Sequence, residues 1–183
     1  LGAKLILAMT GVYDERAIQA LRNYATESKV PELQSQAVAG LAEVDRRAAP
    51  YEKGWWGTQP ARGQPVRVKN QDWSGTSTVL ESLRKVMESS SSPAAKIEVA
   101  KAWRRIADPA AAPLLRKLAA NSDQAELASE AMTTLAAIKD PESLPLFASI
   151  ATDTKRPEAV RREAVRGIMA VGSPEAVRHL VDI

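Results

Sequence analysis

The sequence Asp-Pro-Ala-Ala-Ala-Pro-Leu-Leu at residues 108–115 is followed 32 residues later by Asp-Pro-Glu-Ser-Leu-Pro-Leu-Phe at residues 140–147. Both segments open with a helix-capping residue and a proline suited to a first helical turn, and both end in apolar residues. Ser173-Pro174 opens a third such segment. The chain therefore contains a repeat of about 32 residues, and we expect each copy to form one structural unit.

Apolar residues recur at every third position within each copy, which is the spacing of one helical face. In a first helix they are Ile18, Leu21, Tyr24; Leu80, Leu83, Val86; Ala112, Leu115, Leu118; Leu144, Phe147, Ile150; and Val177, Leu180, Ile183. In a second helix they are Leu41, Trp103, Leu135, Ile168 and Val44, Ile106, Ile138, Val171, beside a column of small residues at Gly40, Ala102, Thr134 and Gly167. We predict an all-α fold, an α-solenoid of helical hairpins in which the small residues allow close helix contacts.

Two prolines lie inside the predicted first helices. Pro113 and Pro145 occupy the same repeat position, four residues after the opening proline. Each removes an amide donor from the helix, so we expect a bend there.

The repeat predicts one array with four full units at about 12–45, 76–107, 108–139 and 140–172, and partial units at 1–11 and 173–183. Because both termini interrupt a unit, we expect the array to continue in a longer parent protein. The step from Glu15 to its equivalent Ser77 is 62 residues, which indicates an insertion at 45–75. This insertion holds three of the four tryptophans and has no helical period.

The two opening octapeptides resemble the first-helix pattern of the HEAT-repeat family, and Val-Arg-Arg-Glu-Ala-Val at 160–165 resembles its second-helix pattern. The resemblance implies a scaffold for protein contacts.

Within the insertion, Tyr-Glu-Lys-Gly-Trp-Trp-Gly-Thr-Gln-Pro at 51–60 and Trp-Ser-Gly-Thr at 73–76 resemble the Trp-Trp-Gly-Thr insertion of the HEAT region in large planctomycete-type haem-binding CxxCH proteins. Those proteins combine a dehydrogenase-like propeller, HEAT repeats and a cytochrome c domain. This narrower resemblance implies an exported, periplasmic parent linked to carbohydrate oxidation.

Trp55, Trp56 and Trp73, with Thr58 and Arg62, are the candidate binding residues. The tryptophans have two interpretations: an aromatic platform for a sugar ring, a peptide or a partner domain, or packing of the insertion against the flanking helices. Packing is the preferred interpretation, because exposing three tryptophans would leave an adhesive patch.

No catalytic or metal-binding motif is found in the sequence, so we predict no enzymatic activity and no cofactor for this chain. It lacks cysteine and CxxCH, and its single histidine, His179, has no second ligand beside it. The longest apolar run, Leu5 to Met9, is too short to span a membrane.

We predict a scaffold that binds other domains of its parent or a protein partner. Nucleic-acid binding and carbohydrate binding through the insertion remain alternatives. The net charge of +3 argues against the first of these, as do the arginine pairs Arg46-Arg47, Arg104-Arg105 and Arg161-Arg162, which occupy different repeat positions.

Overall fold

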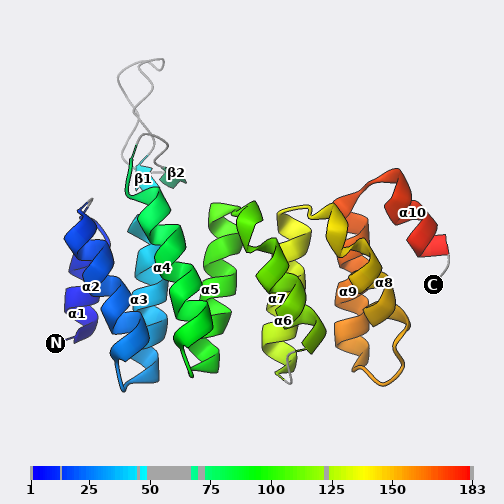
Figure 1. Ribbon diagram of the computed structural model, residues 1–183, viewed down its shortest axis with the longest axis horizontal. Coiled ribbons are helices and arrows are strands. Elements are labelled where there is room, and N and C mark those ends of the chain that lie inside the picture. Colours follow the sequence, from blue (N-terminus) through cyan, green and yellow to red (C-terminus); the bar gives the residue numbers. More distant parts are fainter. Residues whose placement is uncertain are drawn as a thin grey trace, which may run out of the picture.

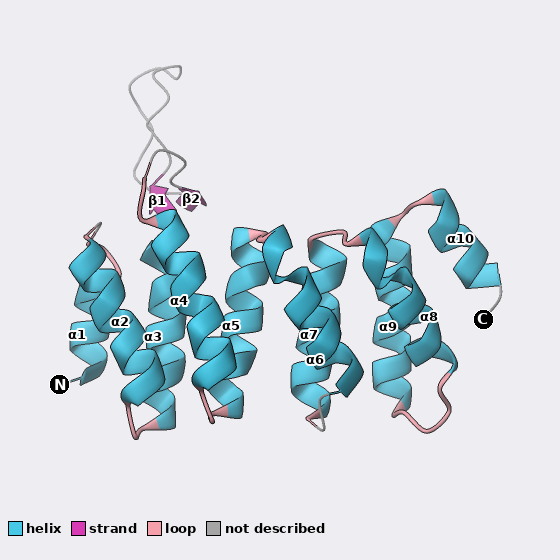
Figure 2. Cartoon of the chain, viewed as in Figure 1, coloured by secondary structure: helices cyan, strands magenta, loops and turns pink. Residues whose placement is uncertain are grey.

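A computed structural model describes residues 2–12, 14–44, 46–48, 67–69, 73–121 and 124–181, and within them the chain is mainly helical (Figure 1). The elements are α1 (Gly2–Met9), α2 (Glu15–Glu27), α3 (Pro31–Val44), β1 (Arg46–Ala48), β2 (Arg67–Lys69), α4 (Thr76–Ser89), α5 (Pro93–Ile106), η1 (Pro109–Ala111), α6 (Ala112–Asn121), α7 (Ala125–Ala137), η2 (Pro141–Ser143), α8 (Leu144–Thr152), α9 (Glu158–Val171) and α10 (Pro174–Val181). The elements η1 and η2 are single 3₁₀ turns. Figure 2 shows how little of the described chain is strand.

The helices pack as successive hairpins, α2 with α3, α4 with α5, α6 with α7 and α8 with α9. We call α2, α4, α6 and α8 the first helices and α3, α5, α7 and α9 the second helices. Second helices pack on one another along the whole row, whereas the first helices pack closely only where α2 meets α4. The hairpins stand side by side along the long axis of the molecule (Figure 1). The fold is therefore the all-α solenoid that the sequence predicts.

The predicted columns form the core. Leu41, Trp103, Leu135 and Ile168 of the second helices are fully buried. In the small-residue column, a β-carbon added at Gly167 would lie 2.8 Å from the Phe147 ring. The absence of a side chain there allows α9 and α8 to approach each other closely.

The two internal prolines separate a 3₁₀ turn from the α-helix that follows it. Pro113 and Pro145 are the second residues of α6 and α8, and η1 and η2 precede these helices directly. Each proline therefore lies in the first turn of an α-helix, where the backbone amide would form no intrahelical hydrogen bond. At each of these prolines the structure shows a 3₁₀ turn followed by a new α-helical start, while the predicted bend stays a prediction.

One predicted core face is wrong. Val177 and Leu180 of α10 were expected to be buried, yet they are 60% and 36% exposed, and Ala176 is the buried residue instead. The reason is that α10 packs on α8 and α9 through one side, while no described helix covers the other. Ile183 lies outside the described residues.

The strands β1 and β2 pair in an antiparallel register, with Arg46 opposite Lys69 and Arg47 opposite Val68. This pair is not predicted from the sequence, because three residues are too few to show an alternating pattern. Of the candidate residues in the predicted insertion, Trp55, Trp56, Thr58 and Arg62 lie outside the described residues. Among the helices that the structure describes, none has the length and apolar character required to cross a membrane.

Candidate functional site

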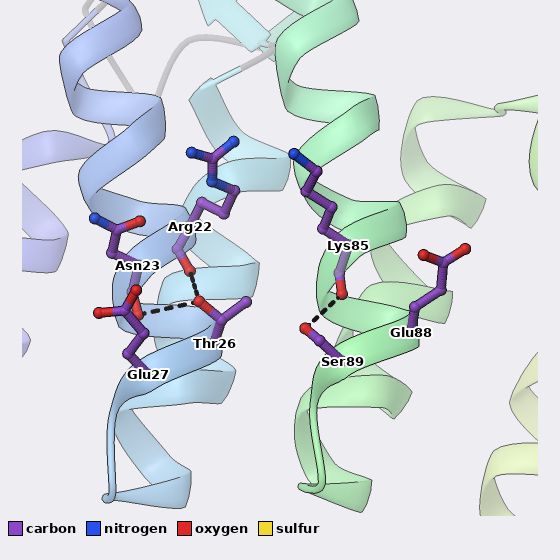
Figure 3. A pocket seen from close by; sticks show the side chains of 7 residues that line it. All are labelled: Arg22, Asn23, Thr26, Glu27, Lys85, Glu88 and Ser89. Atoms are coloured by element: carbon purple, nitrogen blue, oxygen red, sulfur yellow. Dashed lines mark hydrogen bonds between the residues drawn. The ribbon is translucent and has the colours of Figure 1, made fainter.

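A polar groove separates the first helices α2 and α4 (Figure 3). Its volume is about 640 Å³, and it is lined by Arg22, Asn23, Thr26, Glu27, Lys85, Glu88 and Ser89. Figure 3 shows the charged groups of Arg22 and Lys85 extending toward the same end of the groove, with Thr26 and Ser89 nearer the other end. We call this surface the α2–α4 groove.

The two hydroxyl groups of the groove bond to their own helices. Thr26 donates its Oγ1 hydrogen to the carbonyl oxygen of Arg22 at 3.0 Å, and Ser89 donates to that of Lys85 at 2.7 Å. Their oxygen lone pairs therefore remain as acceptors facing the groove. Lys85 also pairs with Glu81 at 3.3 Å, but both side chains are more than half exposed. A surface pair of this kind contributes little and yields easily to a partner.

First-helix arginines bind the residue that opens the next repeat. Arg84 of α4 contacts Asp108 at 2.9 Å, and Arg116 of α6 contacts Asp140 at 2.7 Å. The two partners are 24 residues apart in both cases. These aspartates are largely buried, so each pair fixes one repeat against the next. We call this series of pairs the arginine–aspartate ladder.

Arg22 is the residue of the first complete hairpin that is equivalent to Arg84, because the two are separated by the repeat step of 62 residues. Thr76 occupies the position that Asp108 has one repeat later. A threonine hydroxyl carries no charge, and the Arg22 guanidinium forms no ion pair with any residue in the described ranges. In the part of the chain that the structure describes, the ladder therefore has no acidic partner at the α2–α4 groove.

Charges on the second helices are instead used between repeats. Arg105 pairs with Glu43 at 3.3 Å, and Arg104 pairs with Glu130 at 2.9 Å. Arg166 pairs with a glutamate of its own helix at 3.0 Å. Because Arg104, Arg105 and Arg166 are engaged in these ion pairs, they leave no continuous cationic stripe along the second helices that are described.

The N-terminus of α2 carries a strongly perturbed carboxyl group. Asp14 accepts hydrogen bonds from the Arg16 side chain and from its backbone amide, the latter at 2.8 Å. The side-chain bonds, followed by the backbone bond, lower the pKa of Asp14 to about 2. The helix that forms one wall of the groove is thus held at its start by a carboxylate that stays ionised at neutral pH.

Trp73 is the one candidate from the insertion that the structure describes. Its side chain is half-buried and packs against the hydrophobic core, and its ring covers Gly75 so closely that a β-carbon there would clash with Cζ2. Trp73 also accepts the amide hydrogen of Thr76 at its carbonyl oxygen, just at the start of α4. This is the packing role considered for the insertion; a ligand-binding role for Trp73 stays a prediction.

The α2–α4 groove is not predicted from the sequence. A signal was present, because Arg84 and Arg116 are each followed by an aspartate at the same spacing, and Arg22 shares their register without one. Within the described ranges, no group of three histidine, cysteine, aspartate or glutamate side chains is arranged to hold a metal ion. What the groove offers is a set of charges and hydroxyl acceptors on an open surface, which suits the binding of a polar segment.

The comparisons with known proteins agree with this architecture. Residues 119–183 match the family model for HEAT repeats, a segment that begins near the end of α6 and includes α7 to α9. The comparison with curated proteins gives no match. HEAT repeats are helical hairpins that stack into solenoids and generally serve as scaffolds for protein interactions. Residues 119–183 of this chain therefore resemble HEAT repeats, and the preceding hairpins stack on them in the same all-α solenoid.

Proposed function

We propose that the chain is a non-catalytic scaffold that binds a protein segment in the α2–α4 groove. The observation that carries the proposal is the guanidinium of Arg22, which has no ion-pair partner among the described residues, whereas the equivalent Arg84 and Arg116 each bind an aspartate. A charge without a partner at the edge of an open groove is available to a ligand at no cost in existing ion pairs. The stacked fold supplies the extended, rigid surface that such scaffolds use.

The first-helix face is favoured over the second-helix face for a physical reason. A ligand on the second helices would compete with the ion pairs of Arg104 and Arg105, which already join neighbouring repeats. A second groove of about 500 Å³, lined by residues of α4 and α6 and by the first turns of α5 and α7, lies across α4 from the first. It includes the apolar side chains Met87, Leu114 and Leu118, and Glu88 borders both grooves. A bound segment that crosses α4 would thus meet a charged groove and then a partly apolar one.

Site-specific photo-crosslinking tests this proposal. A photoreactive amino acid at Asn23, in the α2–α4 groove, should crosslink to one defined segment of a partner or of another domain of the parent. Ser149 is the matched control, because it is exposed and has the same repeat position on α8. The crosslinked segment is then identified, synthesised and titrated against the purified chain. Equal crosslinking from Asn23 and Ser149, or a synthetic segment that does not bind, would contradict the proposal.

We propose further that the parent is an exported multidomain protein linked to carbohydrate oxidation, in which this chain joins other domains. The support is the resemblance of residues 51–60 and 73–76 described above. In this setting Trp55 and Trp56 have one of two roles. Either they hold the insertion against the helices, or they contact a ligand together with Thr58 and Arg62.

Trp55→Ala and Trp56→Ala separate these two roles. If the rings pack on the helices, each variant should lower the melting temperature by several degrees, since a buried aromatic side chain contributes about 3 kcal/mol or more. If both variants melt like the unmodified chain and lose affinity for a sugar or a partner domain, the contact role holds. The parent reading frame is a direct check on the wider proposal, because it should encode a propeller domain or a CxxCH motif.

A further inference from the structure

We infer that the α2–α4 groove recognises a carboxylate of its partner, an aspartate or glutamate side chain on an extended segment, which binds Arg22 in place of the missing ladder aspartate. This inference rests on the proposed scaffold function and names the chemistry of the partner. It follows from comparing three repeats of one chain, two of which show the complete interaction.

The completed pairs show what an arginine in this register binds. Arg84 and Arg116 each reach a carboxylate oxygen at less than 3 Å, and in both pairs the aspartate is more buried than the arginine. The planar guanidinium matches the geometry of a carboxylate, which makes such contacts charge-assisted and directional. Arg22 projects from the equivalent position of α2, so a carboxylate near the start of α4 would complete the same arrangement.

The groove adds a second cation on the opposite wall. Figure 3 shows Lys85 of α4 extending toward the same end of the groove as Arg22. Its own partner, Glu81, is 62% exposed in the side chain, so this pair is largely solvated. A carboxylate between α2 and α4 would be attracted by both cations.

The other end of the groove favours a positive group. Glu27 lies five positions after Arg22 on α2, which corresponds to about 7.5 Å along the helix axis. An extended chain advances about 3.3 Å per residue and points alternate side chains to the same face. A basic side chain two residues from the acidic one would therefore lie opposite Glu27, and the recognised pattern is acidic-x-basic.

A labelled peptide, Gly-Ser-Asp-Ser-Lys-Ser-Gly, is the probe, titrated with the full chain at low ionic strength by fluorescence anisotropy. We expect it to bind about tenfold more tightly than the same peptide with Asn in place of Asp, since a hydrogen bond to a charged group is lost in the latter. Arg22→Gln should lower the affinity by a similar factor without lowering the melting temperature. Arg116→Gln is the matched control: it breaks a completed ladder pair, so it should lower the melting temperature and leave the affinity unchanged. Equal affinity for the Asp and Asn peptides, or no effect of Arg22→Gln, would overturn the inference.

Placing a carboxylate at the ladder position that Thr76 occupies gives an independent test. Thr76→Asp should supply the carboxylate that Asp108 supplies one repeat later, raise the melting temperature and lower peptide affinity as much as Arg22→Gln does. Thr76→Asn, which has a similar shape and no charge, should do neither. Undiminished peptide binding by Thr76→Asp would refute the inference. If these peptide experiments fail while the crosslink from Asn23 persists, the partner chemistry is wrong and the scaffold function stands; if both fail, the scaffold function is wrong as well.

Discussion

Gly167→Ala is expected to destabilise the chain, although alanine is the better helix former. The gain in helix propensity is about 1 kcal/mol. Against it stands a new β-carbon 2.8 Å from two carbons of the Phe147 ring, which is fully buried. Overpacking of this kind costs about 2 kcal/mol, so the net loss is about 1 kcal/mol. In a chain of this length that corresponds to a melting temperature lower by about 2–4 °C, measured by circular dichroism at 222 nm.

The proposed clash is tested by replacing the Phe147 ring instead of Gly167. In a Phe147→Leu background the clash disappears, so Gly167→Ala should then raise the melting temperature through its helix propensity alone. A double-mutant cycle made from the four proteins gives the coupling between the two positions. Gly40→Ala serves as a comparison, because its nearest contact is the methyl group of Thr10 at the edge of the array, which can move more readily than a core ring. If Gly167→Ala has the same effect in both backgrounds, the explanation by close helix approach is refuted.

Three further predictions follow from local features. In an NMR titration the carboxyl group of Asp14 should have its midpoint near pH 2, and Arg16→Gln should return it toward the ordinary value. Because the folded-state pKa is lowered, the stabilising contribution of Asp14 is present above the pKa of the unfolded chain and is lost as the pH falls toward 2; a midpoint unchanged by Arg16→Gln would contradict this. Gly75→Ala should displace the Trp73 ring and shift its indole signal, whereas Gly11→Ala, where nothing lies within 4 Å, should leave that signal in place. Binding to DNA or RNA should be weak and should disappear between about 50 and 200 mM salt. A salt-resistant, sequence-dependent complex would show that last prediction to be wrong.

Much of the fold could be predicted because the same pattern of apolar positions recurs in each repeat. A column such as Leu41, Trp103, Leu135 and Ile168 repeats one physical environment, and all four residues are buried. The prolines at 113 and 145 were equally informative, because a missing amide donor has one structural consequence wherever it occurs. Val177 and Leu180 show the limit of this reasoning. A residue that fits a core column becomes buried only if another helix packs on it, and sequence register does not establish that neighbour.

The candidate site was harder to predict, for two reasons. Tryptophans attract attention in a sequence, yet Trp73 packs on Gly75 and the core, where its ring area is used for stability. The α2–α4 groove depends instead on a pairing between residues 24 positions apart, and on its absence at Arg22. A missing partner is visible only after the pair itself has been located in space. Hydrophobic periodicity, which determined the fold, contains no information about that pairing.

The unequal packing of the two helical layers has a mechanical consequence. In a bent beam, the side that is continuous stays nearly constant in length while the opposite side lengthens or shortens. Here the second helices form the continuous side, and the first helices, which pack closely only between α2 and α4, form the opposite one. A small flexure of the array would thus change the spacing of the first helices most. The change would be largest where the first helices pack least, from α4 to α8, so the curvature of the array would vary more there than at the closely packed α2 and α4.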